Sequence, residues 1–204
     1  ETEKRNELEY LIKKTESLVN EMAMVQYKGN IDLVSCSVTS NAPEPGHGIE
    51  LSYDNNPDTY FHTVWKDSPV AEEHYIQVDL GEGKSLAEFV WTYTTYTTPW
   101  GKDFPTKVEV TGSNDALLWH DIKTLSDLPT AQNTAYSADL GSSNNAYRYL
   151  RFTVKATTSG GKYNGYYYFG LAEFGLDRSS TQVNLYADYS PYITTNEMVM
   201  ACDE

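Results

Sequence analysis

The sequence lacks any uninterrupted apolar run of the roughly 18 to 20 residues that a membrane-spanning helix requires, so we expect no membrane insertion. Basic residues are scarce as well: 15 Lys and Arg stand against 29 Asp and Glu, which gives a formal net charge of −14. No basic cluster is longer than Lys13-Lys14. Because so acidic a surface repels phosphate backbones, we expect no nucleic acid partner.

Signatures of common catalytic sites are also absent. The sequence has no HExxH zinc motif, no glycine-rich phosphate loop and no serine elbow. A glycosidase needs only two carboxylates at a set separation, and 29 acidic residues offer such pairs by chance. An enzyme therefore stays open as an alternative, which turnover of a chromogenic glycoside would reveal, but we expect a noncatalytic protein.

Cysteine is rare, and only Cys36 and Cys202 are present. These two positions are compatible with one disulfide or with two free thiols. Thiolate metal sites normally gather four ligands at short spacings, so two distant cysteines do not indicate such a site. We expect buried, unreactive thiols first, a disulfide second and a catalytic thiol last.

Hydrophobic residues make up 40% of the chain, which is enough to bury a core and excludes global disorder. An apolar stripe at three- and four-residue steps predicts a helix over residues 5–27, and Gly29-Asn30 is a suitable end for it. So narrow a stripe must pack on another element. We therefore assign residues 1–30 to a connector helix between modules rather than to a membrane or partner-binding helix.

After this predicted helix, the sequence changes to short alternating segments separated by Gly, Ser, Asn and Asp. Residues 75–80, 107–110 and 149–155 alternate between apolar and polar side chains, and residues 87–95 are rich in aromatic residues and Thr. Many short strands with a single helical stretch predict an all-β fold. We expect an antiparallel β-sandwich, or jelly roll, over residues 31–178.

The two ends of the chain lead us to expect a segment of a longer protein. The first residues are charged and have no signal-peptide pattern, and neither end has the features of a natural terminus. Residues 179–204 begin with a Ser- and Thr-containing break and continue with Tyr and Pro. We assign them to a linker or to the start of a following module.

Four segments, in this order, resemble the discoidin-type domain, also called the coagulation-factor type C domain. They are Tyr53–Thr63, Tyr75–Gly81, Val108–Asp115 with Trp119, and Tyr147–Phe152 followed by Leu171–Phe174. Bacterial members of this family include the family 32 carbohydrate-binding modules. The resemblance covers residues 32–177 and implies a discoidin-like jelly roll that binds ligands through loops at one end and catalyses nothing itself.

A run of oxygen-bearing side chains lies in the first of these segments. Asp54, Asn56, Asp58 and Thr59 fall within six residues of a turn-prone sequence, a pattern that suits a hard cation such as Ca²⁺. The resemblance implies a structural calcium ion held by this loop and by a Glu near the last strand. It assigns Asp54, Asn56, Thr59 and Glu173 as ligands, and the alternative is a metal-free turn.

The resemblance also implies a sugar site, in which aromatic platforms are paired with a few polar side chains. His62 matches a position where family 32 modules often place a sugar-binding His, and Trp100 is the best candidate for an exposed platform. Galactose-binding members carry an Arg after the strand at residues 87–95, where Lys102 is the nearest cation here. The candidate ligand-binding residues are His62, Trp65, Trp100, Lys102, Tyr163 and Tyr166.

Other aromatic and histidine residues are assigned to ordinary structural roles. Trp91 and Trp119 lie in strand-like segments, so we expect them in the core. His47, His74 and His120 are isolated in the sequence, and we expect them to be surface or hydrogen-bonded side chains.

Together these observations predict a noncatalytic, calcium-stabilised carbohydrate-binding module of a larger secreted bacterial protein, by resemblance a glycoside hydrolase. Its expected partners are a glycan or polysaccharide and the other modules of the parent chain, in an extracellular, periplasmic or cell-surface location. The alternative is a protein-interaction or architectural module without sugar binding, because exposed loop aromatics serve either kind of ligand.

Overall fold

The structure of the protein, a computed structural model, describes residues 4–8, 10–12, 14, 31–67, 70–99 and 101–177, and leaves out the side chains of residues 142–144. The described residues before residue 15 are helical, which confirms a helix near the N-terminus. The rest of the helix predicted over residues 5–27 and the predicted linker over residues 179–204 lie outside the described residues. Residues Gly29–Ser179 form one compact unit.

This unit consists of short strands and two 3-10 turns. The strands are β1 (Ser37–Ser40), β2 (Phe61–His62), β3 (Tyr75–Asp79), β4 (Leu86–Thr94), β5 (Pro105–Ser113), β6 (His120–Leu125), β7 (Ala135–Tyr147), β8 (Tyr149–Thr157), β9 (Lys162–Tyr163), β10 (Tyr166–Tyr167), β11 (Gly170–Leu171) and β12 (Glu173–Asp177). The 3-10 turns are η1 (Leu33–Ser35) and η2 (Ile49–Ser52). Within the described residues, no helix combines the length and apolar composition needed to cross a bilayer.

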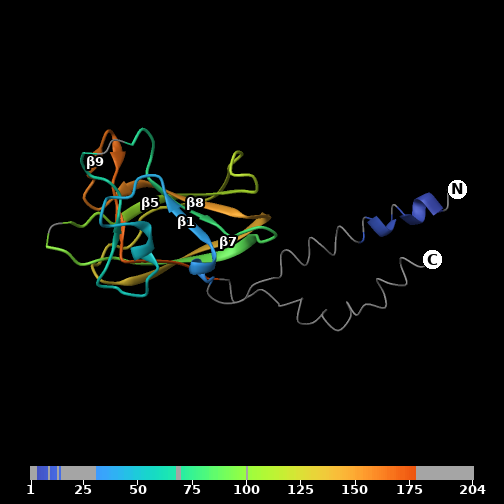
Figure 1. The fold of residues 1–204 in the computed structure, drawn as a ribbon, viewed down its shortest axis with the longest axis horizontal. Coiled ribbons are helices and arrows are strands. Elements are labelled where there is room, and N and C mark those ends of the chain that lie inside the picture. The colour runs from blue at the N-terminus through green and yellow to red at the C-terminus, as the bar shows by residue number, and fades with distance from the viewer. Residues whose placement is uncertain are drawn as a thin grey trace. The chain divides into compact units, whose positions relative to one another are not determined.

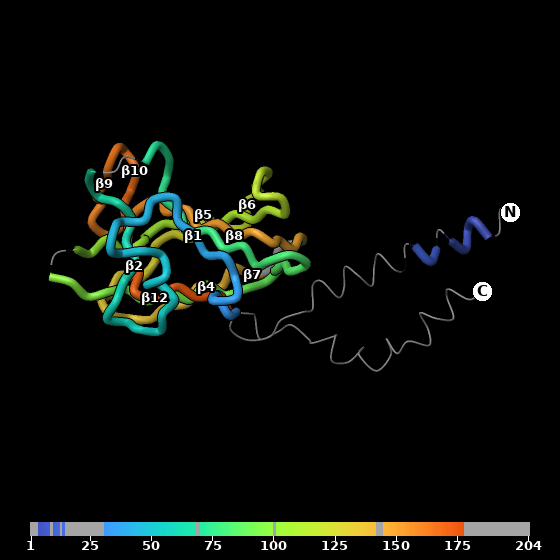
Figure 2. The backbone as a smooth tube through the Cα atoms, in the orientation of Figure 1, coloured from blue at the N-terminus to red at the C-terminus, as the bar shows by residue number. Residues whose placement is uncertain are grey.

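The strands form two layers. The larger sheet has five strands in the order β1-β3-β8-β5-β6, and the smaller sheet has three in the order β12-β4-β7 (Figure 1). Every pairing within these sheets is antiparallel. Figure 2 shows β1, β5, β6 and β8 of the larger sheet running over β4, β7 and β12 of the smaller one. The predicted all-β antiparallel sandwich is therefore confirmed.

The alternation of side chains along the strands explains the layering. In β3, in β12 and over residues 149–155 of β8, every second residue is buried, because one face of each sheet packs on the other sheet. Ile76 and Val78 of β3 and Phe152 of β8 are at most 2% exposed. The four predicted segments correspond to β3, β5, β8 and β4, so the sequence periodicity located these strands correctly.

Two tryptophans show where the periodicity succeeds and where it does not. Trp91 of β4 is 1% exposed and lies 5.5 Å from the ring of Phe152, which confirms its assignment to the core. Trp119 is only half-buried, and its ring lies 3.9 Å from the guanidinium of Arg151. The prediction that Trp119 belongs to the core is wrong, because Trp119 precedes β6 and covers an outward-facing Arg of β8.

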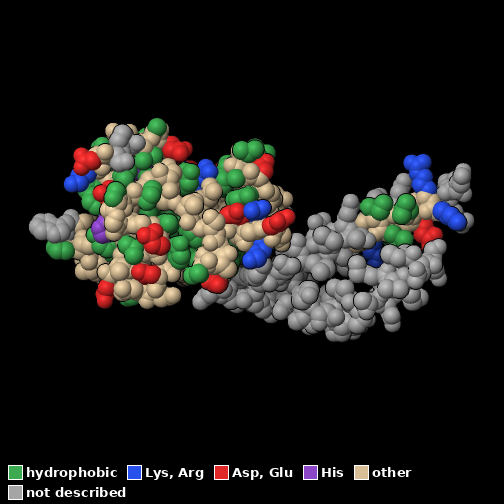
Figure 3. Space-filling model, viewed as in Figure 1, with side chains coloured by type: hydrophobic (Ala, Val, Ile, Leu, Met, Phe, Trp, Pro, Cys, Tyr) green, Lys and Arg blue, Asp and Glu red, His purple; other side chains and the backbone are tan. Residues whose placement is uncertain are grey.

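The first and last residues of the sandwich are neighbours. The backbone N–H of Ile31 donates to the backbone oxygen of Leu176 at 2.9 Å. Residues 95–99 and 101–104, which follow β4, project from the left side of the sandwich in Figure 1, away from these ends. Acidic side chains are spread over the face drawn in Figure 3, as the net charge of −14 requires.

The described cysteine, Cys36, is a free thiol and is half-buried, so it is more exposed than predicted. Burial is the largest effect on its thiol and raises its pKa, although a hydrogen bond with Ser35 and the charge of Lys84 act in the other direction. A raised pKa makes a thiol less reactive, which agrees with the predicted unreactive role. Cys202 lies outside the described residues.

Candidate functional site

Six rings from distant parts of the sequence gather around β2. They are His47, Tyr60, His62, Trp65, Tyr96 and Tyr168, which we call the aromatic cluster. The rings of His47 and Tyr60 stack with centroids 4.3 Å apart, and those of Tyr60 and Tyr96 stack with centroids 4.5 Å apart. Offset stacking of this kind rigidifies the cluster and adds to its burial energy.

Trp65 completes the cluster and faces two of its rings. The ring centroid of Trp65 lies 4.8 Å from that of His62, in an edge-on arrangement. It lies 6.3 Å from the ring centroid of His47, and the planes of Trp65 and His47 are inclined by 52°. Trp65, Tyr60 and His47 are each half-buried, whereas His62 and Tyr96 are buried. Tyr60 is stacked between His47 and Tyr96, so both of its faces are covered, and Trp65 and His47 form the partly exposed aromatic surface above a buried base.

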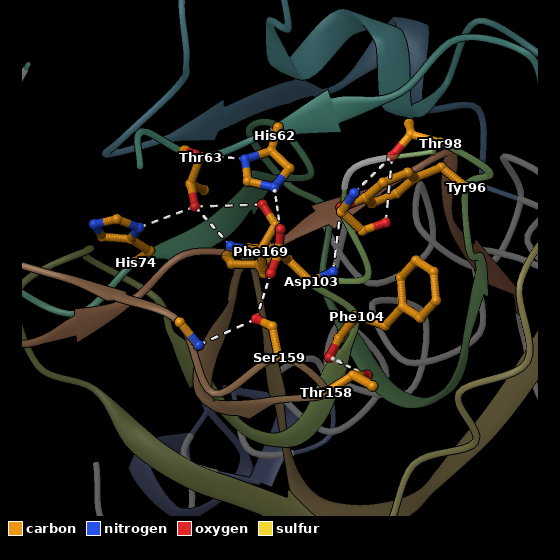
Figure 4. A network of polar contacts seen from close by, with 12 residues as sticks. His62, Thr63, His74, Tyr96, Thr98, Asp103, Phe104, Thr158, Ser159 and Phe169 are labelled. Atoms are coloured by element: carbon orange, nitrogen blue, oxygen red, sulfur yellow. Dashed lines mark hydrogen bonds and ion pairs between the residues drawn. The ribbon is translucent and has the colours of Figure 1, made fainter. Parts of the chain in front are cut away.

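His62 belongs to that buried base and is 4% exposed. Its Nδ1 donates to the backbone oxygen of Thr63 at 2.6 Å, and its Nε2 lies 3.3 Å from Oδ2 of Asp103 (Figure 4). Both ring nitrogens are therefore engaged by the protein. The structure places His62 beside Trp65, and its imidazole is buried.

Asp103 is the charged residue of this base, and no motif in the sequence marks it as a site residue. Its Oδ1 accepts a hydrogen bond from Oγ of Ser159, and its backbone N–H donates to Oη of Tyr96 at 3.3 Å. Burial acts to raise the pKa of Asp103, but hydrogen bonds from His62 and Ser159 and the charge of His62 outweigh it, so the pKa is lowered. Asp103 is accordingly ionised near neutral pH.

A second buried histidine lies on the other side of Thr63. His74 is 1% exposed, and its Nδ1 lies 2.9 Å from Oγ1 of Thr63 (Figure 4). The same hydroxyl accepts the backbone N–H of Phe169 at 2.9 Å. Burial, with a smaller contribution from the charge of His62, lowers the pKa of His74 to about 4. The expectation that His74 is hydrogen-bonded is confirmed, and its imidazole is neutral near pH 7.

The other predicted ligand-binding residues are placed around this cluster without joining it. Lys102 is exposed and precedes Asp103 in the chain. Tyr163 of β9 pairs with Tyr166 of β10, and the hydroxyl of Tyr166 donates to the backbone oxygen of Ala71 at 3.0 Å. Tyr168 is the residue of this segment that reaches His62, at 6.1 Å between centroids. Trp100 lies outside the described residues, and its role stays a prediction.

A glycine makes the close approach between β11 and the aromatic cluster possible. A Cβ atom at Gly170 would lie 2.6 Å from Cδ2 of His62, 2.8 Å from the backbone oxygen of Phe61 and 2.8 Å from Cε1 of Tyr96. We expect Gly170→Ala to destabilise the domain by about 1–3 kcal/mol, because a backbone oxygen and two packed rings cannot move aside without disrupting their own packing. Urea denaturation followed by Trp fluorescence measures the change.

The matched control is Gly48→Ala, where the three atoms nearest to the added Cβ belong to the carboxylate end of Glu50, an exposed and flexible side chain. We expect this variant to unfold at nearly the wild-type urea concentration. Equal losses of stability in the two variants would contradict a specific role for the close approach at Gly170.

The predicted calcium loop is a compact turn rich in oxygen atoms. Oδ2 of Asp54 lies 2.7 Å from Oγ1 of Thr59, and Oδ1 of Asp54 accepts the backbone N–H of Asn56 at 2.9 Å. Asn55 has a φ of 60°, in the left-handed region that Asn tolerates better than most residues. The loop thus brings together three of the four predicted ligands, Asp54, Asn56 and Thr59.

Glu173, the fourth predicted ligand, faces the same loop. Burial and then the negative charge of Asp54 raise the pKa of Glu173, while the backbone N–H groups of Asn55 and Asn56 lower it in part. Its Oε1 is buried and has no hydrogen-bond donor among the described residues. A bound cation would offset the repulsion between the carboxylates of Asp54 and Glu173 and would coordinate the Glu173 oxygen that has no hydrogen-bond donor. These residues therefore fit Ca²⁺.

The ligand set nevertheless contains few charges. No group of three or more His, Cys, Asp or Glu side chains suited to a metal ion occurs within the described ranges. Side-chain amide, hydroxyl and backbone oxygens would therefore have to supplement Asp54 and Glu173, as Ca²⁺ accepts. A cleft of about 770 Å³, lined in part by Asn55, Pro57 and Glu173, borders this loop.

The fold and the site together define a β-sandwich whose loops support an aromatic cluster. The sequence matches the F5/8 type C domain over residues 36–169, well over half of the chain. The chain therefore belongs to the F5/8 type C domain family. A comparison with curated proteins finds no match.

Solved structures share the fold at low sequence identity. One is CpGH89CBM32-5 from Clostridium perfringens, in complex with GalNAc-beta-1,3-galactose: TM-score 0.58, 14% identity, 72% of this chain and 99% of that chain covered. Another is the family 32 carbohydrate-binding module of Clostridium perfringens NanJ, in complex with galactose: TM-score 0.57, 18% identity, 74% and 98% covered. A third is the family 32 module of AlyQ, in complex with 4,5-unsaturated mannuronic acid: TM-score 0.52, 18% identity, 74% and 98% covered.

Proposed function

We propose that this chain is a noncatalytic carbohydrate-binding module that uses the aromatic cluster to bind a glycan. The observation that carries the proposal is the pair of half-buried rings of Trp65 and His47, held over a buried polar base. Aromatic rings stack on the apolar face of a pyranose, and half-buried rings are available for that contact. The three similar sandwiches were solved with sugars, which supports the same ligand class here.

The direct test is a glycan array probed with the protein in calcium-containing buffer. We expect hits that share one terminal sugar, since a small rigid site selects one sugar ring. A blank array would contradict the proposal and direct attention to a protein partner. Turnover of a chromogenic glycoside would instead contradict the noncatalytic role.

Calcium is proposed as a structural ion of the loop that contains Asp54, Asn56 and Thr59, with Glu173 completing the ligand set. The ion would neutralise the carboxylates of Asp54 and Glu173, and it would link the loop to β12. We expect EDTA to lower the melting temperature, because an ion bound only by the folded state stabilises that state. Differential scanning calorimetry with and without EDTA measures the shift, and added Ca²⁺ in excess should reverse it.

The control for this experiment is Glu173→Gln, which keeps the shape of the side chain but removes its charge. The variant should melt at the same temperature with and without EDTA, since the loop would no longer hold the ion tightly. Identical melting of the wild-type protein in the two buffers would remove the calcium proposal.

The wider setting is also part of the proposal. The module would belong to a larger secreted bacterial protein, a glycoside hydrolase by analogy, and would keep it close to its glycan. Other modules of that chain would then be its partners, in an extracellular, periplasmic or cell-surface location. A single stacking site binds weakly, so attachment to a larger chain lets several weak contacts act together.

A further inference from the structure

The cleft of about 770 Å³ has a floor made by the smaller sheet, and none of the six rings of the aromatic cluster lines it. The floor consists of residues in two rows across β12, β4 and β7, whose strands are labelled in Figure 2. The rows are Glu173, Thr94 and Ala135, and Gly175, Thr92 and Ser137. Sites for small molecules typically have volumes of about 300–1,000 Å³, so the cleft is large enough to hold a ligand.

This floor belongs to the outer face of the smaller sheet. Along β4, half-buried Thr92 and Thr94 alternate with buried Trp91 and Tyr93, which belong to the core. Because successive side chains of a strand point to opposite faces, the two threonines point away from the core. Residues 31–34 line the cleft at the β12 edge, where the chain is hydrogen-bonded to β12. The cleft is therefore open to solvent over the sheet and bordered at one edge.

Gly175 keeps the middle of the floor low. A Cβ atom at this position would collide with Oγ1 of Thr92 on the neighbouring strand. Any side chain here would therefore fill the space above β12 and β4. Glycine inside a strand often marks a place where a ligand approaches the backbone closely, and the floor of this cleft has that form.

The hydroxyl groups of the floor are available to a ligand. Within the part of the chain that the structure describes, the side chains of Thr92, Thr94 and Ser137 make no hydrogen bond. Each hydroxyl can donate one hydrogen bond and accept others. At the end of the floor, Oε1 of Glu173 is buried and has no donor among the described residues. The cleft therefore offers both donors and acceptors that the protein itself leaves unused.

The charges around the cleft indicate the class of ligand. Among the described residues that line it, none is Lys, Arg or His, and the charged ones are Asp32 and Glu173. An anionic ligand would be repelled by these carboxylates and would lack a cation to pair with. An apolar ligand would leave the floor hydroxyls without hydrogen bonds. A neutral ligand that carries many hydroxyl groups avoids both costs.

We propose that this cleft is a second sugar-binding site, which holds a neutral oligosaccharide chain along the outer face of the smaller sheet. The sugar class rests on the proposed function, whereas the position of the site and its preference for a neutral ligand rest on the cleft. Its volume is in the upper part of the range for small-molecule sites, which suits several sugar units better than one ring. Two sites on one module bind a polysaccharide more tightly than either site alone.

The first test locates the binding by NMR. The 15N-labelled full chain is titrated in calcium-containing buffer with β-1,4-galactotetraose, cellotetraose and mannotetraose. With at least one of them, the backbone N–H signals of Thr92, Thr94, Ser137 and Gly175 should shift. Tetragalacturonic acid and tetralysine, as anionic and cationic probes, should leave these signals unchanged. The proposal is overturned if none of the three neutral sugars shifts these signals, or if a charged probe shifts them instead.

The second test removes the floor hydroxyls. The double variant Thr92→Val with Thr94→Val keeps the shape of both side chains and should melt like the wild type, because these hydroxyls bond nothing in the protein. Its affinity for the tetrasaccharide, read from the titration curve of the Ser137 signal, should fall about tenfold through the loss of two hydrogen bonds. Unchanged affinity would contradict the proposal.

The matched control is Thr111→Val, which removes a half-buried hydroxyl from β5 of the larger sheet. This variant should bind the tetrasaccharide like the wild type. Ser137→Ala keeps the test decisive if the double variant does not fold, since it changes a single exposed side chain. It should weaken binding about threefold, read from the Gly175 signal, and wild-type binding by this variant would count against the proposal.

Trp65→Ala separates this proposal from the proposed function. The variant removes the platform of the aromatic cluster, yet the signals of Thr92 and Ser137 should still shift with the tetrasaccharide. Loss of these shifts in Trp65→Ala would overturn an independent second site. In the wild type, shifts around Trp65 alone would support the proposed function and overturn the second site, and shifts in the cleft alone would do the reverse.

Discussion

Trp65→Ala is expected to lower the affinity for a glycan that the array identifies by about 10- to 100-fold. One aromatic platform contributes about 1–3 kcal/mol through its buried area and stacking, and Trp65 is the largest partly exposed ring of the aromatic cluster. Isothermal titration calorimetry measures the change. The melting temperature should fall only slightly, because the half-buried ring lies outside the core between the two sheets.

Trp119→Ala is the matched control for this prediction. It removes the same side chain, also half-buried, from the outer side of the larger sheet, where the ring covers Arg151. We expect Trp119→Ala to retain wild-type affinity. Equal binding by Trp65→Ala and the wild type would place the sugar site elsewhere, and Trp100 would then be the next candidate to test.

Acid should destabilise the domain through His74, whose pKa is about 4 in the folded protein and about 6.5 in an unfolded chain. Above pH 6.5 the imidazole is neutral in both states, so stability does not change with pH through this group. Between pH 6.5 and pH 4, the unfolded state binds the proton and the folded state does not. The free energy of unfolding should therefore fall by about 3 kcal/mol over this range and level off below it.

Urea denaturation at a series of pH values from 7 to 4 measures this effect. Carboxylates such as Asp103 also titrate in acid, so the contribution of His74 is the difference between the wild type and His74→Gln. We expect that difference to shrink as the pH falls, because the variant has no proton to gain at this position. His120→Gln at an exposed site should show the full wild-type dependence. A pH-independent difference would contradict the prediction.

The sandwich could be predicted from the sequence because its strands follow a period of two. Residues such as Ile76 and Val78 alternate with polar ones, and this alternation defines the buried face of each strand without any knowledge of the partner strand. The same alternation does not predict the position of Trp119. Whether a ring before a strand turns inward or covers an Arg on the outside depends on the neighbouring strand, which the local pattern does not contain.

The candidate site was less predictable for a similar reason. His62 and Trp65 are near in sequence and belong to a recognisable motif, so they were found together. Asp103 lies 41 residues beyond His62, and the two side chains meet only because the loop after β4 returns to β2. His47 was judged isolated because nothing in the sequence marks its stacking on Tyr60. The motif indicates two residues of the candidate site, but the buried base beneath them depends on tertiary contacts.

The hydrogen bond between Ile31 and Leu176 makes the sandwich an insertable unit. The backbones of Ile31 and Leu176, near the two ends of the sandwich, lie as close as two neighbouring strands of a sheet, which is about 5 Å. A loop of another protein would have to open by only that width to receive the whole domain, and the host fold would remain undistorted. The same closeness allows the ends to be joined and new ends to be cut in an exposed turn.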